Sequence, residues 1–302
     1  MPPSGLTALI LGAGAGGGVP QWNCACRVCQ LVRSGDARVC ASTQVGVAFS
    51  ADETHWLLVG ASPDLRQQIL KTPQLHPREG PRDSPIFATA LISADVDGIA
   101  GLLVLREQQR LSVFAPGPVL EVLRRNAVFD VLNPAMVDRI HVAPLHAVDC
   151  GYGLTLTLLP MPGKVPLYLE DRAAEQPQAA PTYAALVQAN GHRVIVAPAC
   201  AEISDTVRSH LRLADVVFFD GTLFTDDEMI TAGVGTKTGR RMGHVPVSGV
   251  GGSLEGLADL PARKIFLHIN NTNPLLLNGS PERRQAEEAG FEVAFDGMEV
   301  RL

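Results

Sequence analysis

Three cysteines stand within six residues of one another, at Cys24, Cys26 and Cys29. Thiolates at positions i, i+2 and i+5 can converge on one Zn²⁺ when a fourth ligand comes from elsewhere in the chain. Side chains this close in sequence make a poor long-range disulfide framework, and clustered exposed thiols would be a liability in a cytosolic protein. The spacing therefore predicts a closed, structural zinc site. The alternative is one buried cysteine and two free ones.

Carboxylates follow two apolar segments of the chain. Asp95 and Asp97 come after the segment that ends at Ile92, and Asp220 comes directly after Val216–Phe219. Acids just after a strand end can reach a metal ion or polarise a substrate. The competing interpretations are an N-cap pair for a helix that begins just after Asp97, and an ordinary turn residue at Asp220.

A long loop rich in glycine, threonine and basic residues spans positions 233–246 and contains His244. Its cations are Lys237, Arg240 and Arg241. Such a loop can present backbone N–H groups and positive charge to an anionic ligand. A flexible surface loop is the alternative interpretation, and these residues alone leave both open.

The strand-like segment Lys264–Ile269 contains His268 near its end, and three asparagines follow within five residues, at Asn270, Asn271 and Asn273. Polar residues gathered at a strand end need many hydrogen-bond partners, which favours a functional site over a plain turn. The other histidines have no partner nearby in the sequence, and we expect them on the surface or in the core: His55, His76, His141, His146, His192 and His210.

The glycines at positions 12–17 match the dinucleotide-binding fingerprint and follow a strand-like segment. That fingerprint requires a helix directly after it, whose N-terminus faces a pyrophosphate. Here Gly18, Val19 and Pro20 follow, which indicates a loop, and Asp36 stands in a turn rather than at a strand end. We therefore expect these glycines to let the backbone pass close to another segment or a ligand, rather than to bind a nucleotide.

Strand-like apolar segments recur along the chain and outnumber the helix-like ones. The expected strands are 6–11, 43–49, 56–59, 86–92, 111–114, 154–159, 192–197, 216–219, 264–269 and 291–295. The expected helices are 63–70, 119–126, 205–212, 225–233 and 281–289. Two packed sheets with helices outside fit this α/β pattern better than a doubly wound sheet. No composition shift divides the chain, so residues 1–302 are expected to form one domain, with an inserted loop at 170–182.

Charge and composition exclude several classes of protein. Against 31 Asp+Glu the chain carries 25 Lys+Arg, a net charge of −6, which argues against a general nucleic-acid or anionic-membrane surface. A hydrophobic fraction of 46% with 19% charged residues is typical of globular proteins. No apolar run approaches the roughly 20 residues that a membrane span needs. We therefore expect a soluble, cytoplasmic protein.

The order of these residues is similar to that of the metallo-β-lactamase superfamily, with carboxylates after one strand, an acid after a later strand and a histidine after the last. More closely, and over nearly its whole length, the chain resembles the coenzyme PQQ synthesis protein B family. The motifs that carry the resemblance are Gly16–Gly18, Pro20–Cys24 with the cysteine cluster, Ala61–Asp64, Gly163–Glu170, Asp220–Thr222, Asp226–Met229, Gly233–Thr236, Met242–His244, His268–Pro274 and Phe295–Met298.

The resemblance implies an αββα sandwich of the metallo-β-lactamase type with the site at one edge of the two sheets, and a role in making pyrroloquinoline quinone (PQQ). Members of the family have been described as helpers in PQQ export and as iron-dependent oxygenases that hydroxylate the tyrosine ring of a peptide-derived Glu–Tyr precursor. The resemblance also implies structural zinc on Cys24, Cys26 and Cys29. In related phosphodiesterases the residue three after the terminal histidine completes such a site. Asn271 holds that position here, and because an amide is a weak zinc ligand, the fourth ligand stays open.

The chain departs from the superfamily at the metal motif. The pattern His-x-His-x-Asp-His falls on residues 93–98, and the family usually keeps the final Asp-His, but here Asp97 is followed by Gly98. Either a ligand has been lost at Gly98, or this position needs a backbone conformation that glycine adopts most easily. The remaining candidates for catalysis and for an active-site metal are Asp97, Asp220, His244 and His268. Two imidazoles and a carboxylate suit non-haem Fe(II), with open positions for O₂ and substrate.

We consider two hypotheses for the function. In the first, the protein is an iron-dependent hydroxylase of PQQ biosynthesis, and Lys237, Arg240 and Arg241 hold the carboxylates of its substrate. In the second, the same cationic site carries PQQ or its precursor without catalysis and assists transport to the periplasm. The missing imidazole at Gly98 favours the second. Other PQQ biosynthesis proteins and a second copy of the chain are candidate partners.

Overall fold

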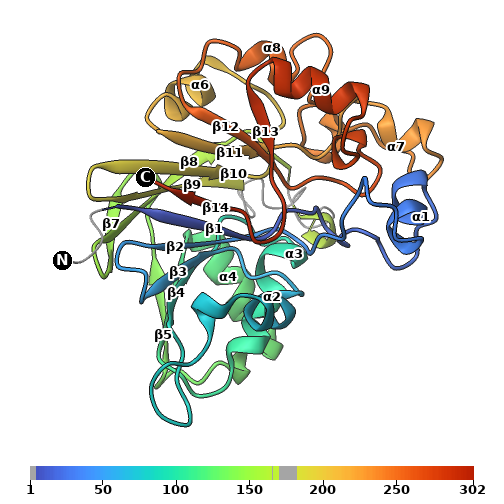
Figure 1. Ribbon diagram of the computed structural model, residues 1–302. Helices are drawn as coiled ribbons and strands as arrows, with labels where there is room; N and C mark the ends of the chain where they lie inside the picture. Colours follow the sequence, from blue (N-terminus) through green and yellow to red (C-terminus); the bar gives the residue numbers. More distant parts are fainter. Residues whose placement is uncertain (1–4, 165, 170–181) are drawn as a thin grey trace.

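The computed structural model describes residues 5–164, 166–169 and 182–302. Two seven-stranded sheets pack face to face, and helices cover their outer faces (Figure 1). This is the αββα sandwich that the sequence predicted.

The first sheet has the strand order β14-β1-β2-β3-β4-β5-β6. The strands from β14 to β3 pair antiparallel, and those from β3 to β6 pair parallel. The last strand of the chain therefore lies beside the first. The bounds are β1 Thr7–Gly12, β2 Gly46–Ser50, β3 Trp56–Val59, β4 Ile86–Ala90, β5 Leu111–Ala115, β6 Val137–His141 and β14 Glu299–Arg301.

The second sheet has the order β13-β12-β11-β10-β9-β8-β7. Here β7 to β10 pair antiparallel and β10 to β13 pair parallel. The bounds are β7 Ala147–Gly151, β8 Leu154–Met161, β9 Thr182–Ala189, β10 His192–Ala197, β11 Val216–Asp220, β12 Arg263–Leu267 and β13 Phe291–Val293.

Short helices connect the strands: α1 Arg27–Arg33, α2 Leu65–Lys71, α3 Val96–Ile99, α4 Gly117–Arg125, α6 Asp205–Leu211, α7 Glu228–Thr231, α8 Ser253–Gly256 and α9 Pro281–Glu288. In Figure 1, α6, α8 and α9 lie over the second sheet, α2 and α4 lie under the first, and α1 and α7 lie at the right-hand side. Helix α9 begins at Pro281, as predicted, and Ser280 caps it, whereas α2 begins at Leu65, two residues after Pro63. No helix of the described residues is long and apolar enough to cross a membrane.

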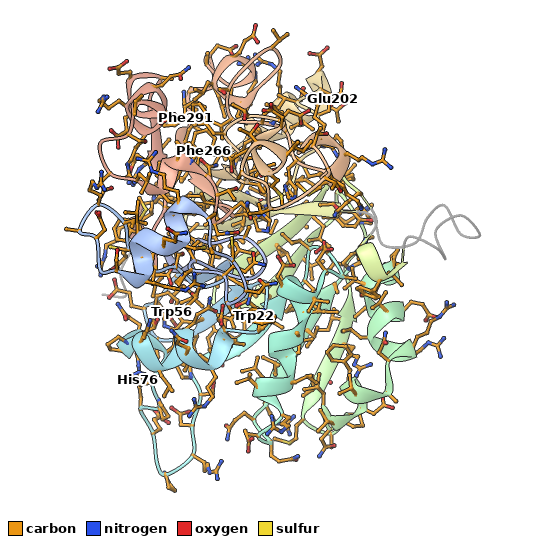
Figure 2. The ribbon with its side chains drawn as sticks, turned by 90° about the vertical axis from the view of Figure 1, so that its right-hand side faces the viewer. Trp22, Trp56, His76, Glu202, Phe266 and Phe291 are labelled. Carbon is orange, nitrogen blue, oxygen red and sulfur yellow. The ribbon has the colours of Figure 1, made fainter. Side chains whose placement is uncertain are left out.

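Both faces of the sheets are buried, because successive side chains of a strand point to opposite sides. In β12, Ile265 and Leu267 face the other sheet, while Phe266 faces the helices. There Phe266 stacks on Phe291, with ring centroids 4.6 Å apart (Figure 2). Burial on both sides explains the near-continuous apolar runs that identified these strands in the sequence.

Four strands were missed by the sequence analysis. The edge strands β6 and β7 contain Asp138, Arg139 and Asp149, and their exposed polar residues break the apolar pattern. β14 is only three residues long, and β9 follows the predicted loop 170–182. All of that loop except Thr182, the first residue of β9, lies outside the described residues.

Candidate metal centres

The three cysteines of the cluster lie together in the structure. The Sγ atoms of Cys24, Cys26 and Cys29 lie within 4.8 Å of one another. Cys26 is the N-cap residue of α1 and Cys29 lies in its first turn, so a loop and a helix start bring the three sulfurs together. Arg33, at the end of the same helix, donates hydrogen bonds to the carbonyls of Gln21 and Cys24 and thereby closes the loop.

The side-chain amide of Asn271 lies against all three sulfurs. Its Nδ2 is 3.1 Å from Sγ of Cys24, 3.5 Å from that of Cys26 and 3.3 Å from that of Cys29. In a tetrahedral zinc site, neighbouring ligand atoms are about 3.6–3.8 Å apart. A rotation of the amide by 180° exchanges its nitrogen and oxygen, so Asn271 Oδ1 can stand where a fourth ligand belongs.

The thiols of this cluster differ in acidity. Burial is the largest influence on the pKa of Cys26 and raises it to about 11. Burial also acts to raise the pKa of Cys24, but hydrogen bonds from Cys26, Cys29 and Asn271 outweigh it and lower that pKa. A metal ion that binds Cys26 as a thiolate must displace its proton, so metal uptake here should weaken as the pH falls.

The second cluster is assembled at one end of the second sheet. β11 and β12 are parallel neighbours in which Asp220 pairs with Leu267, so Asp220 and His268 lie at the same sheet edge. One oxygen of Asp220 and one nitrogen each of His244 and His268 lie within 4.8 Å of one another. His268 has a φ of 59°, a left-handed conformation that is uncommon outside glycine and is typical of functional sites.

Asp220 is fully buried, and both of its oxygens are engaged. Oδ1 accepts from the backbone N–H of Thr222 at 3.1 Å and from its hydroxyl at 2.6 Å. Oδ2 accepts from the Cys200 N–H at 2.9 Å and lies 2.9 Å from His244 Nδ1. These four contacts account for the lone pairs of an ionised carboxylate, so in this arrangement Asp220 positions its neighbours.

Asp97 reaches the cluster from α3, the short helix that comes after β4 of the first sheet. Its Oδ2 is 3.3 Å from His268 Nε2. Burial acts to raise the pKa of Asp97, but the hydrogen bond and charge of His268 outweigh burial and lower that pKa. For His268, burial acts to lower the pKa. The hydrogen bond with Asp97, together with the charges of Asp97, Asp220 and Asp95, outweighs burial and raises that pKa. Two carboxylates and two imidazoles thus form one electrostatic unit.

The local structure around Asp97 differs from the sequence prediction. β4 ends at Ala90, so Asp97 lies in the first turn of the short helix α3 rather than directly after a strand. Asp95 is the N-cap residue of that helix, but its side chain makes no capping hydrogen bond. Burial, followed by the charge of Asp97, raises the pKa of Asp95.

Gly98 does not need to be glycine. It lies in α3 outside the left-handed region, and a Cβ there would be 3.4 Å from Ser93 Oγ, an ordinary van der Waals distance. The alternative that this position needs a backbone conformation specific to glycine is therefore wrong.

The cationic loop leads into the second cluster. The turn Arg240–Met242 ends two residues before His244. The guanidinium of Arg240 donates to the carbonyls of Val250 and Gly251 at 3.1 and 3.2 Å. Arg241 is exposed and Lys237 half-buried. The role of these three cations in ligand binding stays a prediction.

The glycine-rich segment makes close backbone contacts, as predicted. No helix follows the fingerprint in the chain up to Arg27, where α1 begins. Gly14 forms bridges with Gln44 and Ile269, and a Cβ at Gly16 would be 3.3 Å from Asp97 Oδ2. The segment thus passes beside the second cluster.

Two residues of this region were not singled out from the sequence, although both belong to motifs of the family resemblance. Thr222 directly contacts both imidazoles. Glu228 is buried and accepts from the Phe224 N–H at 2.6 Å and from Thr272 Oγ1 at 2.5 Å, which ties the segment after His268 to α7. Burial raises the pKa of Glu228 to about 7.

Comparison with known proteins identifies the family. The family model "Beta-lactamase superfamily domain" matches residues 55–269. Coenzyme PQQ synthesis protein B of Methylobacterium nodulans is 50% identical over 299 residues, which cover 98% of this chain and 100% of that protein. The chain belongs to the coenzyme PQQ synthesis protein B family. The family's protein from Gluconacetobacter diazotrophicus is 48% identical over 302 residues, covering 97% of this chain and 98% of that one.

Solved structures agree with this assignment. Zn²⁺-bound PqqB from Methylobacterium extorquens matches with a TM-score of 0.93 and 45% identity over 98% of this chain and 100% of that one. A diphosphatase of the PhnP family matches with a TM-score of 0.70 at 20% identity over 99% and 97%, which shows a shared fold. The metallo-β-lactamase fold and the resemblance stated from the sequence are both confirmed.

Proposed function

We propose that this member of the family acts in PQQ biosynthesis as a metal-dependent oxygenase that hydroxylates the tyrosine ring of a Glu–Tyr precursor. The observation that carries the proposal is the facing pair His268 Nε2 and Asp97 Oδ2, 3.3 Å apart, with His244 beside them. Neighbouring ligands of one divalent metal, each about 2.1 Å from it, are about 3 Å apart. This donor set fits an iron ion, because two imidazoles and one carboxylate are typical ligands of non-haem Fe(II).

Each side chain has a distinct part in this proposal. His244, His268 and Asp97 would hold the ion, while Asp220 orients His244 from its buried position. Fe(II) held there would supply the activation of O₂. Ring hydroxylation adds one oxygen atom of O₂ to the substrate and releases the other as water, and an external reductant supplies two electrons and two protons.

The cationic loop would bind the substrate. The Glu–Tyr precursor carries carboxylates, and Arg241 and Lys237 lie on the segment that leads to His244. Arg240 already bonds to two backbone carbonyls, so its charge would act from a fixed position. Zinc would occupy the other cluster, with Asn271 as its fourth ligand, and would hold the loop at residues 24–29 in place.

A carrier function is the second candidate, because Gly98 stands where the family usually has a histidine. A carrier would bind PQQ or its precursor through the same cations and release it unchanged. Pathway partners, a homodimer and a cytoplasmic location stay predictions.

Anaerobic Fe(II) titration, followed by O₂, ascorbate and the Glu–Tyr precursor, tests the proposal. We expect Fe(II) to bind and mass spectrometry to detect a precursor that has gained oxygen, while His268→Asn yields no product. Asparagine tolerates the left-handed backbone of position 268, so this variant removes the imidazole without adding strain. Binding of PQQ or precursor without Fe(II) and without turnover would replace the oxygenase with the carrier.

A further inference from the structure

The hydroxyl of Thr222 lies at the centre of the second cluster. Its Oγ1 is 2.6 Å from Asp220 Oδ1, 3.0 Å from His244 Nδ1 and 2.8 Å from His268 Nδ1. The residue is 5% exposed. One small buried group therefore contacts both imidazoles and the buried carboxylate.

The hydrogen-bonding capacity of a hydroxyl decides the direction of these contacts. A threonine hydroxyl has one proton and two lone pairs, whereas an ionised carboxylate can only accept. Thr222 must therefore donate its proton to Asp220, which is also its shortest contact. Its two lone pairs then face the two Nδ1 atoms, so each imidazole donates an Nδ1–H to Thr222.

This direction determines which ring nitrogens can bind a metal. When Nδ1 carries the proton, Nε2 carries the lone pair of a neutral imidazole. His268 Nε2 faces Asp97 Oδ2 at 3.3 Å, and a metal ion bound between them would replace the proton that these two atoms share. We infer that Thr222 is a positioning residue: it fixes both His244 and His268 as Nδ1–H tautomers and thereby presents both Nε2 atoms as ligands. The inference rests on the proposed metal site and assigns a role to a residue that contacts no metal in it.

The two imidazoles depend on Thr222 to different degrees. His244 Nδ1 has a second acceptor, Asp220 Oδ2, at 2.9 Å. Among the described residues, the hydrogen bond of His268 Nδ1 goes to Thr222. Removal of the hydroxyl should therefore release His268 and leave His244 held.

The test compares Thr222→Val, which is close in shape and lacks the hydroxyl, with Thr222→Ser, which keeps it. Co(II) serves as the probe, because an imidazole N–H beside Co(II) gives a shifted, exchangeable proton NMR signal. We expect the wild type to show two such signals, and Thr222→Val to lose the His268 signal and keep that of His244. Loss of an outer hydrogen-bond partner lowers metal affinity by roughly 10–100-fold. We expect Thr222→Val to lose Co(II) affinity in this range and Thr222→Ser to keep an affinity close to that of the wild type.

Several outcomes would overturn the inference. They are wild-type affinity in a folded Thr222→Val, equal losses in both variants, and a wild-type protein that binds no Co(II) through imidazoles. Thermal melting shows whether Thr222→Val folds. If it does not fold, the inference is tested by whether the wild type shows both N–H signals and whether Thr222→Ser retains them. A protein that binds Co(II) as expected but never hydroxylates the precursor would contradict the proposed oxygenase and leave the role of Thr222 standing.

Discussion

At the cysteine cluster, three of the four candidate ligands come from one short loop and the start of α1. At the second cluster, of histidines and aspartates, each candidate ligand comes from a different segment. The cysteine cluster joins the loop at residues 24–29 to Asn271, whose amide lies against all three sulfurs. The side chains of the second cluster are already held by protein hydrogen bonds, through Thr222 and Asp220. A metal at the first site should therefore stabilise the fold, and a metal at the second should serve chemistry.

The largest expected effect is that of Cys26→Ser. Because metal binding at a structural site contributes directly to folding, the variant should lose its zinc and about 3 kcal/mol or more of unfolding free energy. Metal analysis and thermal melting measure both quantities. Cys40→Ser is the matched control, since Cys40 is exposed and lies outside the cluster. Full zinc content and unchanged melting in Cys26→Ser would reject the structural site.

His268→Asn should give the opposite pattern. Loss of a ligand imidazole should weaken Fe(II) binding by at least about 100-fold, while zinc content and melting temperature stay close to those of the wild type. His141→Asn, at an exposed histidine of β6, is the control. If His268→Asn instead lowers the melting temperature and leaves the Fe(II) affinity unchanged, the assignment of the two centres is wrong.

Gly98→His sharpens the comparison, because it adds a donor to the second cluster only. A Cβ fits at this position, and an imidazole that replaces a weakly held water should raise Fe(II) affinity by about tenfold. Gly98→Ala separates the donor from the backbone effect, since alanine in a helix adds about 0.5–1 kcal/mol of stability over glycine. Equal Fe(II) affinity in stably folded Gly98→His and Gly98→Ala would show that this edge of α3 does not face the metal.

Glu228→Gln should have the smallest effect, seen in the pH dependence of stability. Burial raises the pKa of Glu228 from 4.5 to about 7 in the folded protein. The folded state therefore binds this proton more tightly than the unfolded state. The contribution of the bound proton to the free energy of unfolding is complete below pH 4.5 and is lost as the pH rises through about 7. Glutamine stays neutral and resembles the protonated form. Denaturant unfolding at pH 5 and pH 8 should show a smaller loss of stability for Glu228→Gln than for the wild type; equal losses would contradict this assignment.

The sequence predicted what is local or repetitive. The three cysteines needed only their spacing, and the buried strands needed only their apolar runs. Asp220 and His268 were found because each follows such a run, and the parallel pairing of β11 and β12 brings them to one edge.

The rest depended on contacts between distant segments. Nothing in the sequence places Asp97 of α3 against His268, which follows β12 and lies 171 positions away; the family resemblance suggested that pairing. Thr222 was overlooked because a threonine after Asp-Gly looks like a turn residue until both imidazoles lie against it. The polar edge strands β6 and β7 were missed because one side of each has no neighbouring strand.

Anomalous diffraction at the zinc and iron absorption edges, from crystals of protein loaded anaerobically with Fe(II), tests the central claim most directly. We expect a zinc peak surrounded by Cys24, Cys26, Cys29 and Asn271. We also expect a separate iron peak bonded to His244, His268 and Asp97, with Thr222 and Asp220 behind the imidazoles. A single peak at the cysteines, or an iron peak bonded to Asp220 and not to Asp97, would contradict the account.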